Sequence, residues 1–372
     1  MTTIYDVAKA AGVSPKTVSR VLNGDAPVKA PTRTAVERAI ADLGYVPSSA
    51  ARAMRSNRTG LLGVLTGAIS VASTDPADSG LPEVFIVQGI QRALESAGMT
   101  LLIADTGGRT DKAVPLMRTF SEHRVEGLIH VADYHRKVDL PRPPGGAPLV
   151  LANCYDHHGT PCVLPDDRAG QRALTESVIA AGHRRIAYLS LAADLDATRL
   201  RTEGYRDALR AAGIPIDPDL LVPADILTRQ SDHIGEVAAL RAALDKVLSL
   251  DAPPTVLMCG NDRLALRAYG MLRSRGLRIP QDIGVAGYDN YALIAESLYP
   301  RLSTAELPYV AMGERAAQLM LDLIGRGEAA SLPSKPVLVG GPVCWRDSIA
   351  DHEEATHSNH KSDQSRSGRR LQ

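Results

Sequence analysis

The sequence is poor in cysteine and aromatic residues. Its four cysteines lie far apart, at positions 154, 162, 259 and 344, without any CxxC spacing. This favours buried or free thiols in a reducing compartment over a disulfide framework or a cysteine-based zinc site. The N-terminus also lacks an apolar signal segment, and no apolar run is long enough to span a bilayer. We therefore expect a cytoplasmic protein without a membrane partner.

Net charge is also absent, because 42 basic residues balance 42 acidic ones. The balance is uneven along the chain: residues 1–60 hold nine Lys or Arg residues and only four Asp or Glu residues. A basic segment attracts phosphates by releasing counterions, so nucleic acid is the leading partner. A chain of 372 residues that is 44% hydrophobic should form two or three folded units.

Residues 3–23 predict two short helices separated by a turn at Gly12. Thr3 followed by Asp6, and Ser14 followed by Pro15, are both typical helix starts. A third helix is expected near residues 32–43. Its apolar face would hold Val36, Ile40 and Leu43, and it would stop at Gly44. A compact all-α unit needs a core, and five residues of the first two helices have the spacing for it: Val7, Val13, Val18, Val21 and Leu22.

From residue 61, apolar runs alternate with amphipathic segments, which predicts βαβα units with parallel sheets. The expected helices of this core are 83–97, 111–123, 169–181, 199–212, 235–250 and 262–275. We divide the chain into a helix-turn-helix headpiece (1–45), a hinge helix or linker (46–59), a core (60–349) and a tail (350–372). The hinge is too short to fold without a partner, and the polar tail is expected to be disordered.

Several motifs closely resemble the LacI/GalR (lactose repressor) family of bacterial regulators, over residues 2 to about 348. They are IYDVAKAAGVSPKTVSRVLNG, LGYVPSSAARAM, GHRRIAYL, GNDRLALRAYGML and IGVAGYDN. The resemblance implies a three-helix DNA-binding headpiece, a hinge helix and a two-lobed core similar to periplasmic sugar-binding proteins. It also implies an effector between the lobes and, by family default, repression. We expect a homodimer or higher oligomer on a near-palindromic operator, with no cofactor.

The second helix would enter the major groove, where side chains read a pattern unique to each base pair. Matched to the family motif, the base-contact candidates are Pro15, Lys16 and Arg20. The phosphate-contact candidates are Thr3, Tyr5, Ser14, Thr17, Ser19 and Asn23. The alternative is a basic helix face that is merely solvated.

In the hinge, Met54 stands where family members commonly have a leucine that wedges into the minor groove. Ala51 matches the small residue beside that wedge. The alternative is that Met54 packs on the core.

In the core, the resemblance assigns effector contacts to Arg201, Asn261 and Asp289. Each flanks an apolar strand, and strand ends in open α/β sheets line a common crevice. Asp262 is expected to cap the following helix. Without the resemblance, such residues are more often salt bridges or caps.

Two further positions depart from the family pattern. Glu83 stands where many relatives have a phenylalanine, and Ile226 matches a position where some have a stacking aromatic ring. Two aromatic walls are therefore expected to be missing, so the effector would be held by hydrogen bonds. This favours a sugar, polyol or sugar acid over a purine.

An enzyme and a free-standing sugar receptor are the rival hypotheses. The sequence has no GxGxxG after a strand, and it contains neither a phosphate-binding GxxxxGK[ST] motif, nor GxSxG, nor HExxH. The basic headpiece argues against a receptor. His157 and His158 suggest a metal, but no second ligand pair has workable spacing, so a solvated loop is expected there and no metal site is assigned.

Overall fold

The computed structural model describes residues 2–24, 27–46, 58–67, 83–107, 109–224, 233–326 and 335–351. The chain forms two compact units. The first comprises Met1–Leu61 with Arg124–Glu126, and the second comprises Leu62–His123 with Gly127–Gln372.

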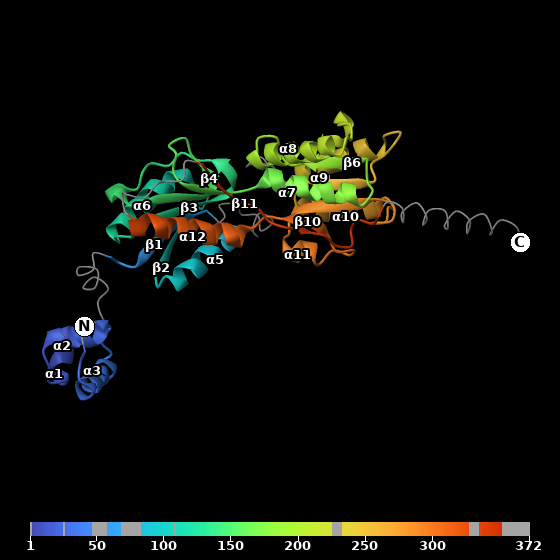
Figure 1. The fold of residues 1–372 in the computed structure, drawn as a ribbon. Coiled ribbons are helices and arrows are strands. Elements are labelled where there is room, and N and C mark those ends of the chain that lie inside the picture. The colour runs from blue at the N-terminus through green and yellow to red at the C-terminus, as the bar shows by residue number, and fades with distance from the viewer. Residues whose placement is uncertain are drawn as a thin grey trace, which may run out of the picture. The chain divides into compact units, whose positions relative to one another are not determined.

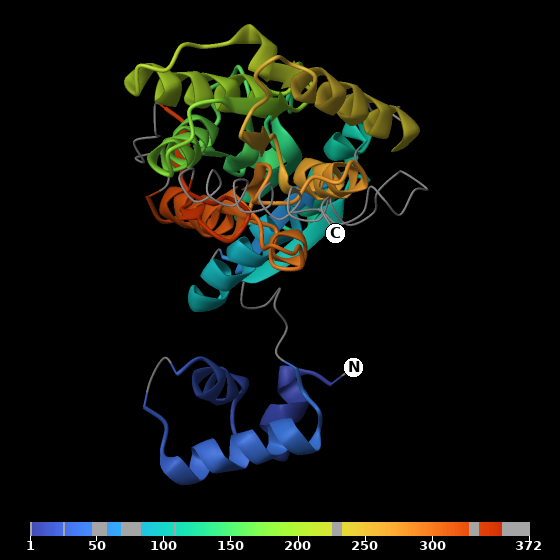
Figure 2. The ribbon, with the colours of Figure 1, turned by 90° about the vertical axis from the view of Figure 1, so that its right-hand side faces the viewer.

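Three helices pack around one small core in the first unit (Figures 1 and 2): α1 (Ile4–Ala10), α2 (Pro15–Asn23) and α3 (Ala30–Asp42). Both predicted helix starts are confirmed. Thr3 and Asp6 form a reciprocal capping box, and the Ser14 side chain accepts from the Thr17 N–H at 3.3 Å, with Pro15 at the first helical position. Gly12 occupies the turn between α1 and α2 with φ +65°, a conformation that favours glycine.

The core of this headpiece is close to the prediction. Val7, Val18 and Val36 are completely buried. Val13 and Leu22 pack against the core while partly buried. Leu43 was expected on the buried face of α3, and this was wrong: it follows the last helical residue and is 38% exposed.

The second unit contains two lobes, each built on a six-stranded sheet (Figure 1). The first lobe has the strand order β11-β5-β4-β3-β1-β2. Its strands are β1 (Leu61–Thr66), β2 (Thr100–Asp105), β3 (Leu128–Lys137), β4 (Leu149–Tyr155), β5 (Cys162–Pro165) and β11 (Val337–Val339). Its helices are α5 (Glu83–Ser96), α6 (Ala113–Glu122) and α12 (Tyr309–Arg326). Apolar residues of α5 and α12 form one core with β1, β3 and β4.

The second lobe has the order β12-β10-β9-β8-β6-β7. Its strands are β6 (Ile186–Ser190), β7 (Leu221–Pro223), β8 (Val256–Cys259), β9 (Gly284–Asp289), β10 (Ser303–Glu306) and β12 (Val343–Cys344). Its helices are α7 (Asp167–Ala180), α8 (Asp196–Ala211), α9 (His233–Leu248), α10 (Asp262–Ser274) and α11 (Ala292–Ala295). The strand pairs are parallel apart from β10 with β12. Short 3₁₀ turns lie at Thr110–Lys112, Pro144–Gly146 and Pro218–Leu220.

The chain crosses between the lobes at three places: after β5, between β10 and α12, and between β11 and β12. Such crossings leave the facing strand ends of both sheets around a shared crevice. The two-lobed α/β fold class with a helical headpiece is confirmed.

Six core helices were expected, and each lies within a few residues of its predicted range. The long helix α12 was missed. Its buried positions Met312, Ala316 and Met320 have helical spacing, so the signal was present. Cys154, Cys162 and Cys259 are buried free thiols, as expected. Within the described residues, no helix is long and apolar enough to cross a membrane.

Candidate DNA-binding and effector sites

The recognition helix α2 presents a polar face built from the predicted base-contact residues. Lys16 and Arg20 are exposed and lie one turn apart, and Pro15 is half-buried at the start of the helix. Side chains four residues apart project from the same face of a helix. Two cationic side chains are therefore free to enter a groove together.

Phosphate-contact candidates surround this face. Tyr5 is 71% exposed. The hydroxyl groups of Thr3, Ser14 and Thr17 already take part in helix-capping bonds. A hydroxyl has one donor hydrogen. That of Thr3 is given to Asp6 Oδ2, whereas one of the Ser14 and Thr17 hydroxyls keeps its hydrogen for a phosphate oxygen.

The remaining DNA-contact candidates are Ser19, Asn23, Ala51 and Met54. Ser19 is only 6% exposed and offers little surface to a phosphate, and its phosphate contact stays a prediction. Asn23 is the last residue of α2. Ala51 and Met54 lie outside the described residues.

In the second lobe, Arg201 of α8 is the centre of a buried polar cluster. Its Nε donates to Asp167 Oδ1 at 2.7 Å and its Nη1 to the Gly260 carbonyl oxygen at 2.6 Å. Its Nη2 lies 3.9 Å from Asp289 Oδ1, and the guanidinium group lies 3.7 Å from the centre of the Tyr288 ring. Arg201 is thus brought next to Asp289 and to the residue that precedes Asn261.

Asp167 is a residue that the sequence analysis missed. Its side chain is completely buried, and its Oδ2 also accepts a hydrogen bond from His135 Nδ1 at 3.0 Å. Burial alone would raise the pKa of Asp167, but Arg201 and His135 outweigh burial and hold it below the ordinary value. His135 belongs to β3 of the first lobe, so Asp167 joins an effector candidate to the opposite lobe. The signal was the acidic pair Asp166-Asp167 at the start of a predicted helix.

A second polar contact joins the lobes nearby. Tyr155, at the end of β4, donates its hydroxyl to Asp196 Oδ2 at 3.0 Å, and Asp196 is the first residue of α8. The rings of Tyr155 and His135 meet edge to face at 6.0 Å. The two contacts between the lobes therefore lie side by side.

Asp289 ends β9 in an unusual backbone conformation. Its φ is +124° and that of Asn290 is +53°, so two successive non-glycine residues have positive φ. Such strain persists where the surrounding structure holds it, often at ligand sites. Burial raises the pKa of Asp289 against the opposing charge of Arg201, and the nearby Asp262 carboxylate adds to the rise.

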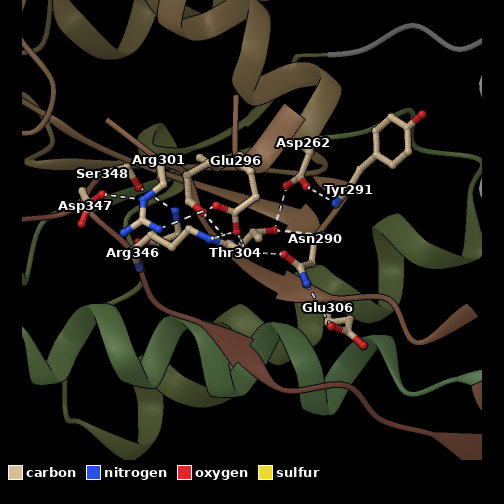
Figure 3. A network of polar contacts seen from close by, with 12 residues as sticks. Asp262, Asn290, Tyr291, Glu296, Arg301, Thr304, Glu306, Arg346, Asp347 and Ser348 are labelled. Carbon is tan, nitrogen blue, oxygen red and sulfur yellow. Dashed lines mark hydrogen bonds and ion pairs between the residues drawn. The ribbon is translucent and has the colours of Figure 1, made fainter. Parts of the chain in front are cut away.

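Asp262 was expected to cap α10, and this was wrong, because the preceding residue Asn261 is the cap. Asn261 caps α10, since its Oδ1 accepts from the Leu264 N–H at 2.8 Å. Asp262 instead accepts from the Thr304 hydroxyl at 2.7 Å and from the Tyr291 N–H at 2.8 Å (Figure 3). The cap uses only the oxygen of the Asn261 amide, so its nitrogen is the group that would donate to an effector.

A network of polar contacts continues from Asp262 along β10 (Figure 3). Arg346 Nη2 donates to Asn290 Oδ1 at 2.8 Å, and Asn290 Nδ2 donates to Glu306 Oε2 at 2.9 Å. Burial raises the pKa of Asp262, although its bonds from Thr304 and Tyr291 act against burial. The network fixes the strained segment at the end of β9.

A cavity of about 310 Å³ adjoins this segment. Asp262, Asp289 and Glu306 give it three carboxylates, with Arg263 as its cation. Its other walls are mainly apolar and come from α5, α11 and the start of α12. Arg201 and Asn261 are not among its described lining residues, but Arg201 Nη2 lies 3.9 Å from Oδ1 of the lining residue Asp289.

The cavity has aromatic side chains in its wall. Phe85, Tyr291 and Tyr309 line it, and the rings of Phe85 and Tyr291 lie 6.4 Å apart. Phe85 lies in the first turn of α5, two residues after Glu83. The expectation that positions 83 and 226 lack aromatic walls stays a prediction. Glu83 begins α5, and Ile226 lies outside the described residues.

Comparison with known proteins identifies the family of this chain. Residues 3–48 match the family of bacterial regulatory proteins of the lacI type, and residues 175–349 match the periplasmic binding protein-like domain. The sucrose operon repressor of Shigella flexneri is 33% identical over 340 residues, which cover 91% of this chain and 99% of that protein. The chain belongs to the LacI family. Its members are DNA-binding transcription regulators with an effector-binding core.

Other members confirm the likeness over most of the chain. The ribose operon repressor of Escherichia coli (strain K12) is 33% identical, covering 87% of this chain and 93% of that one. The solved complex of the transcriptional regulator CelR with cellobiose is 30% identical with a TM-score of 0.61, covering 94% and 100%. The lac repressor dimer bound to operator and an anti-inducer is 25% identical with a TM-score of 0.69, covering 94% and 99%.

Proposed function

We propose that this LacI-family chain is a cytoplasmic repressor, not an enzyme, whose affinity for a near-palindromic operator is set by a sugar or polyol. The observation that carries this proposal is the convergence of Arg201, Asp289 and the Asn261 cap on one crevice, in a chain that also bears a basic helix-turn-helix unit. Carboxylate, guanidinium and amide groups suit the paired hydroxyls of a sugar.

The effector class follows from the walls of the cavity. The described lining residues include three acidic side chains and Arg263, and such hydrogen-bonding groups suit the hydroxyls of a neutral sugar. Aromatic walls suit the apolar face of a sugar ring. The sucrose and ribose operon repressors are named for sugar operons, and the solved CelR complex holds cellobiose, a neutral sugar.

At the DNA, we assign base contacts to Lys16 and Arg20, with Pro15 against a base edge. Tyr5 and the helix-capping hydroxyls would hold phosphates. In the hinge, Met54 would part a base step beside Ala51. Apolar side chains of this length wedge into the minor groove and kink the duplex.

A homodimer is supported by apolar side chains on the second lobe. Leu266 of α10, Leu293 of α11 and Tyr299 are 45%, 72% and 84% exposed. Tyr269 of α10 donates to the Pro300 carbonyl oxygen at 3.0 Å, which holds the segment of Tyr299 against that helix. Exposed apolar groups mark an interaction surface where they are contiguous. Two copies would also supply the two headpieces that a two-fold operator needs.

The switch would act through Asp167. An effector that contacts Arg201 or Asp289 perturbs the group that also holds His135 of the first lobe. Moving the lobes of a dimer would move its headpieces. An effector can shift this equilibrium only by its differential affinity for the two arrangements.

Two measurements test the proposal together. A thermal-shift panel of neutral sugars, polyols, sugar acids and purines should reveal a neutral hydroxylated ligand, because a ligand that binds the folded state raises its stability. That ligand should change the affinity of the purified chain for its own promoter fragment without being consumed. Turnover of the ligand, or no binding to the promoter fragment, would contradict the proposal.

A further inference from the structure

The loops at the ends of β3 and β4 bring together three side chains with metal-ligating atoms. They are Asp139, His157 and His158, all exposed, and one ligand atom from each lies within 4.8 Å of the other two. In the sequence the histidine pair had no third ligand at workable spacing. The fold supplies one from a strand that ends almost twenty residues earlier.

The three groups already contact one another. His158 Nε2 lies 3.4 Å from Asp139 Oδ1, and the two imidazole rings lie 3.8 Å apart between their centres. Ligand atoms around a tetrahedral Zn²⁺ ion lie about 2.0–2.2 Å from the metal, so small side-chain rotations would let these three meet one ion.

The backbone of both loops is anchored. The Val138 N–H donates to the Tyr155 carbonyl oxygen at 2.8 Å, which ties the segment of Asp139 to the strand that leads to the histidines. Asp156 Oδ1 accepts from the N–H groups of His158 and Thr160 at 3.0 and 3.1 Å. The ligands are therefore held near one another before any ion arrives, which lowers the entropy cost of binding.

The loop that holds the histidines carries a second acidic side chain. Asp156 Oδ2 is buried and has no hydrogen-bond partner among the described residues. Asp139 and Asp156 therefore place two carboxyl groups in the two loops of the cluster, which favours a bound cation there.

We propose that Asp139, His157 and His158 form a surface site for a divalent transition-metal ion, with Zn²⁺ as the ion that fits best. Two imidazole nitrogens and one carboxylate suit Zn²⁺, whereas Mg²⁺ and Ca²⁺ prefer oxygen ligands throughout. Water would complete the coordination, because three protein ligands leave a fourth position open. The site does not depend on the effector proposal.

Zinc titration of the full-length chain by calorimetry tests the proposal. The tail contains His352, His357 and His360, so all proteins in the test carry asparagine at these three positions. One Zn²⁺ per chain is expected at pH 7.5, and weaker binding at pH 5.5, where protons compete for the imidazoles. His158→Ala and Asp139→Asn should each weaken binding at least about tenfold.

His123→Ala removes an exposed histidine from the end of α6 and is the matched control, with affinity unchanged. Asp139, His157, His158 and His123 are all exposed, so variants at these positions should melt with the parent. Absence of zinc binding by the parent, or equal affinity in the parent and a His157→Ala/His158→Ala double variant, would overturn the proposal. An anomalous zinc peak between the three side chains in a crystal would support it directly.

Discussion

Arg20 is the residue of α2 that we expect to read one base pair of the operator. Its side chain is exposed on α2, so Arg20→Ala should leave the headpiece folded while it removes a base contact worth about 1–3 kcal/mol at one operator position. Binding to a set of single-base operator variants measures this. Arg38→Ala, an equal loss of charge from α3, should weaken all variants alike. If Arg20→Ala does the same, Arg20 contacts phosphate only.

Asp289 makes a prediction about pH. Its pKa is raised in the folded chain, so between the ordinary value near 3.8 and the raised value the folded state binds more protons than the unfolded state. This group therefore lowers stability as pH rises. Asp289→Asn does not titrate, so the melting temperature of the variant relative to wild type should increase from pH 5 to pH 8.5. A constant difference would show that Asp289 has an ordinary pKa.

The sequence predicted which residues lie near the site, but not which contacts each of them makes. Asp289 ends β9 as expected, but Arg201 lies within α8, with its Nη2 3.9 Å from Asp289 Oδ1. The Arg201–Asp167 pair was not predictable, since it depends on how α7 packs beside α8. Replacing Arg201 alone would leave Asp167 buried without its main cation, at a cost of about 3–5 kcal/mol.

At the scale of elements, α5 and α12 cross unusually closely. A Cβ atom on Gly313 of α12 would overlap the Ile86 carbonyl oxygen of α5. Gly313→Ala should therefore force the helices apart and lower the free energy of unfolding by about 1–3 kcal/mol, measured by urea denaturation. Gly325→Ala in the same helix meets no atom within 4 Å and should be neutral or slightly stabilising. Equal stability of the two variants would contradict the close crossing.

Helices that begin or end at a cap or turn residue could be predicted from the sequence. Strands defined only by partners distant in sequence could not. Caps and turns placed α1 and α2, because Thr3, Ser14 and Gly12 act on their immediate neighbours. The short strands β11 and β12 have three and two residues, too few for a periodic pattern, and are defined by partners distant in sequence. Phe85 was not predicted as a cavity wall, because its ring meets Tyr291, a residue distant in sequence.

For the whole molecule, the proposed dimer face makes the next prediction. Leu266→Glu puts a charge among exposed apolar side chains and should dissociate the dimer at micromolar concentration, as measured by sedimentation. Leu338→Glu is the control, because Leu338 is 56% exposed on β11 of the other lobe. Dissociation by the control alone, or by neither variant, would place the dimer face elsewhere.

The coupling of effector and operator is the central claim, and one titration tests it most directly. The sugar found in the thermal-shift panel is added to the operator complex of wild type, of Asp289→Ala and of the exposed control Asp111→Ala, all in one buffer. Loss of a charge-assisted contact costs about 1.5–3 kcal/mol, so the midpoint for Asp289→Ala should move about 10- to 100-fold higher. Affinity for the operator without sugar should stay the same, and so should the midpoint of the control. An unchanged midpoint in a folded Asp289→Ala variant would contradict the account.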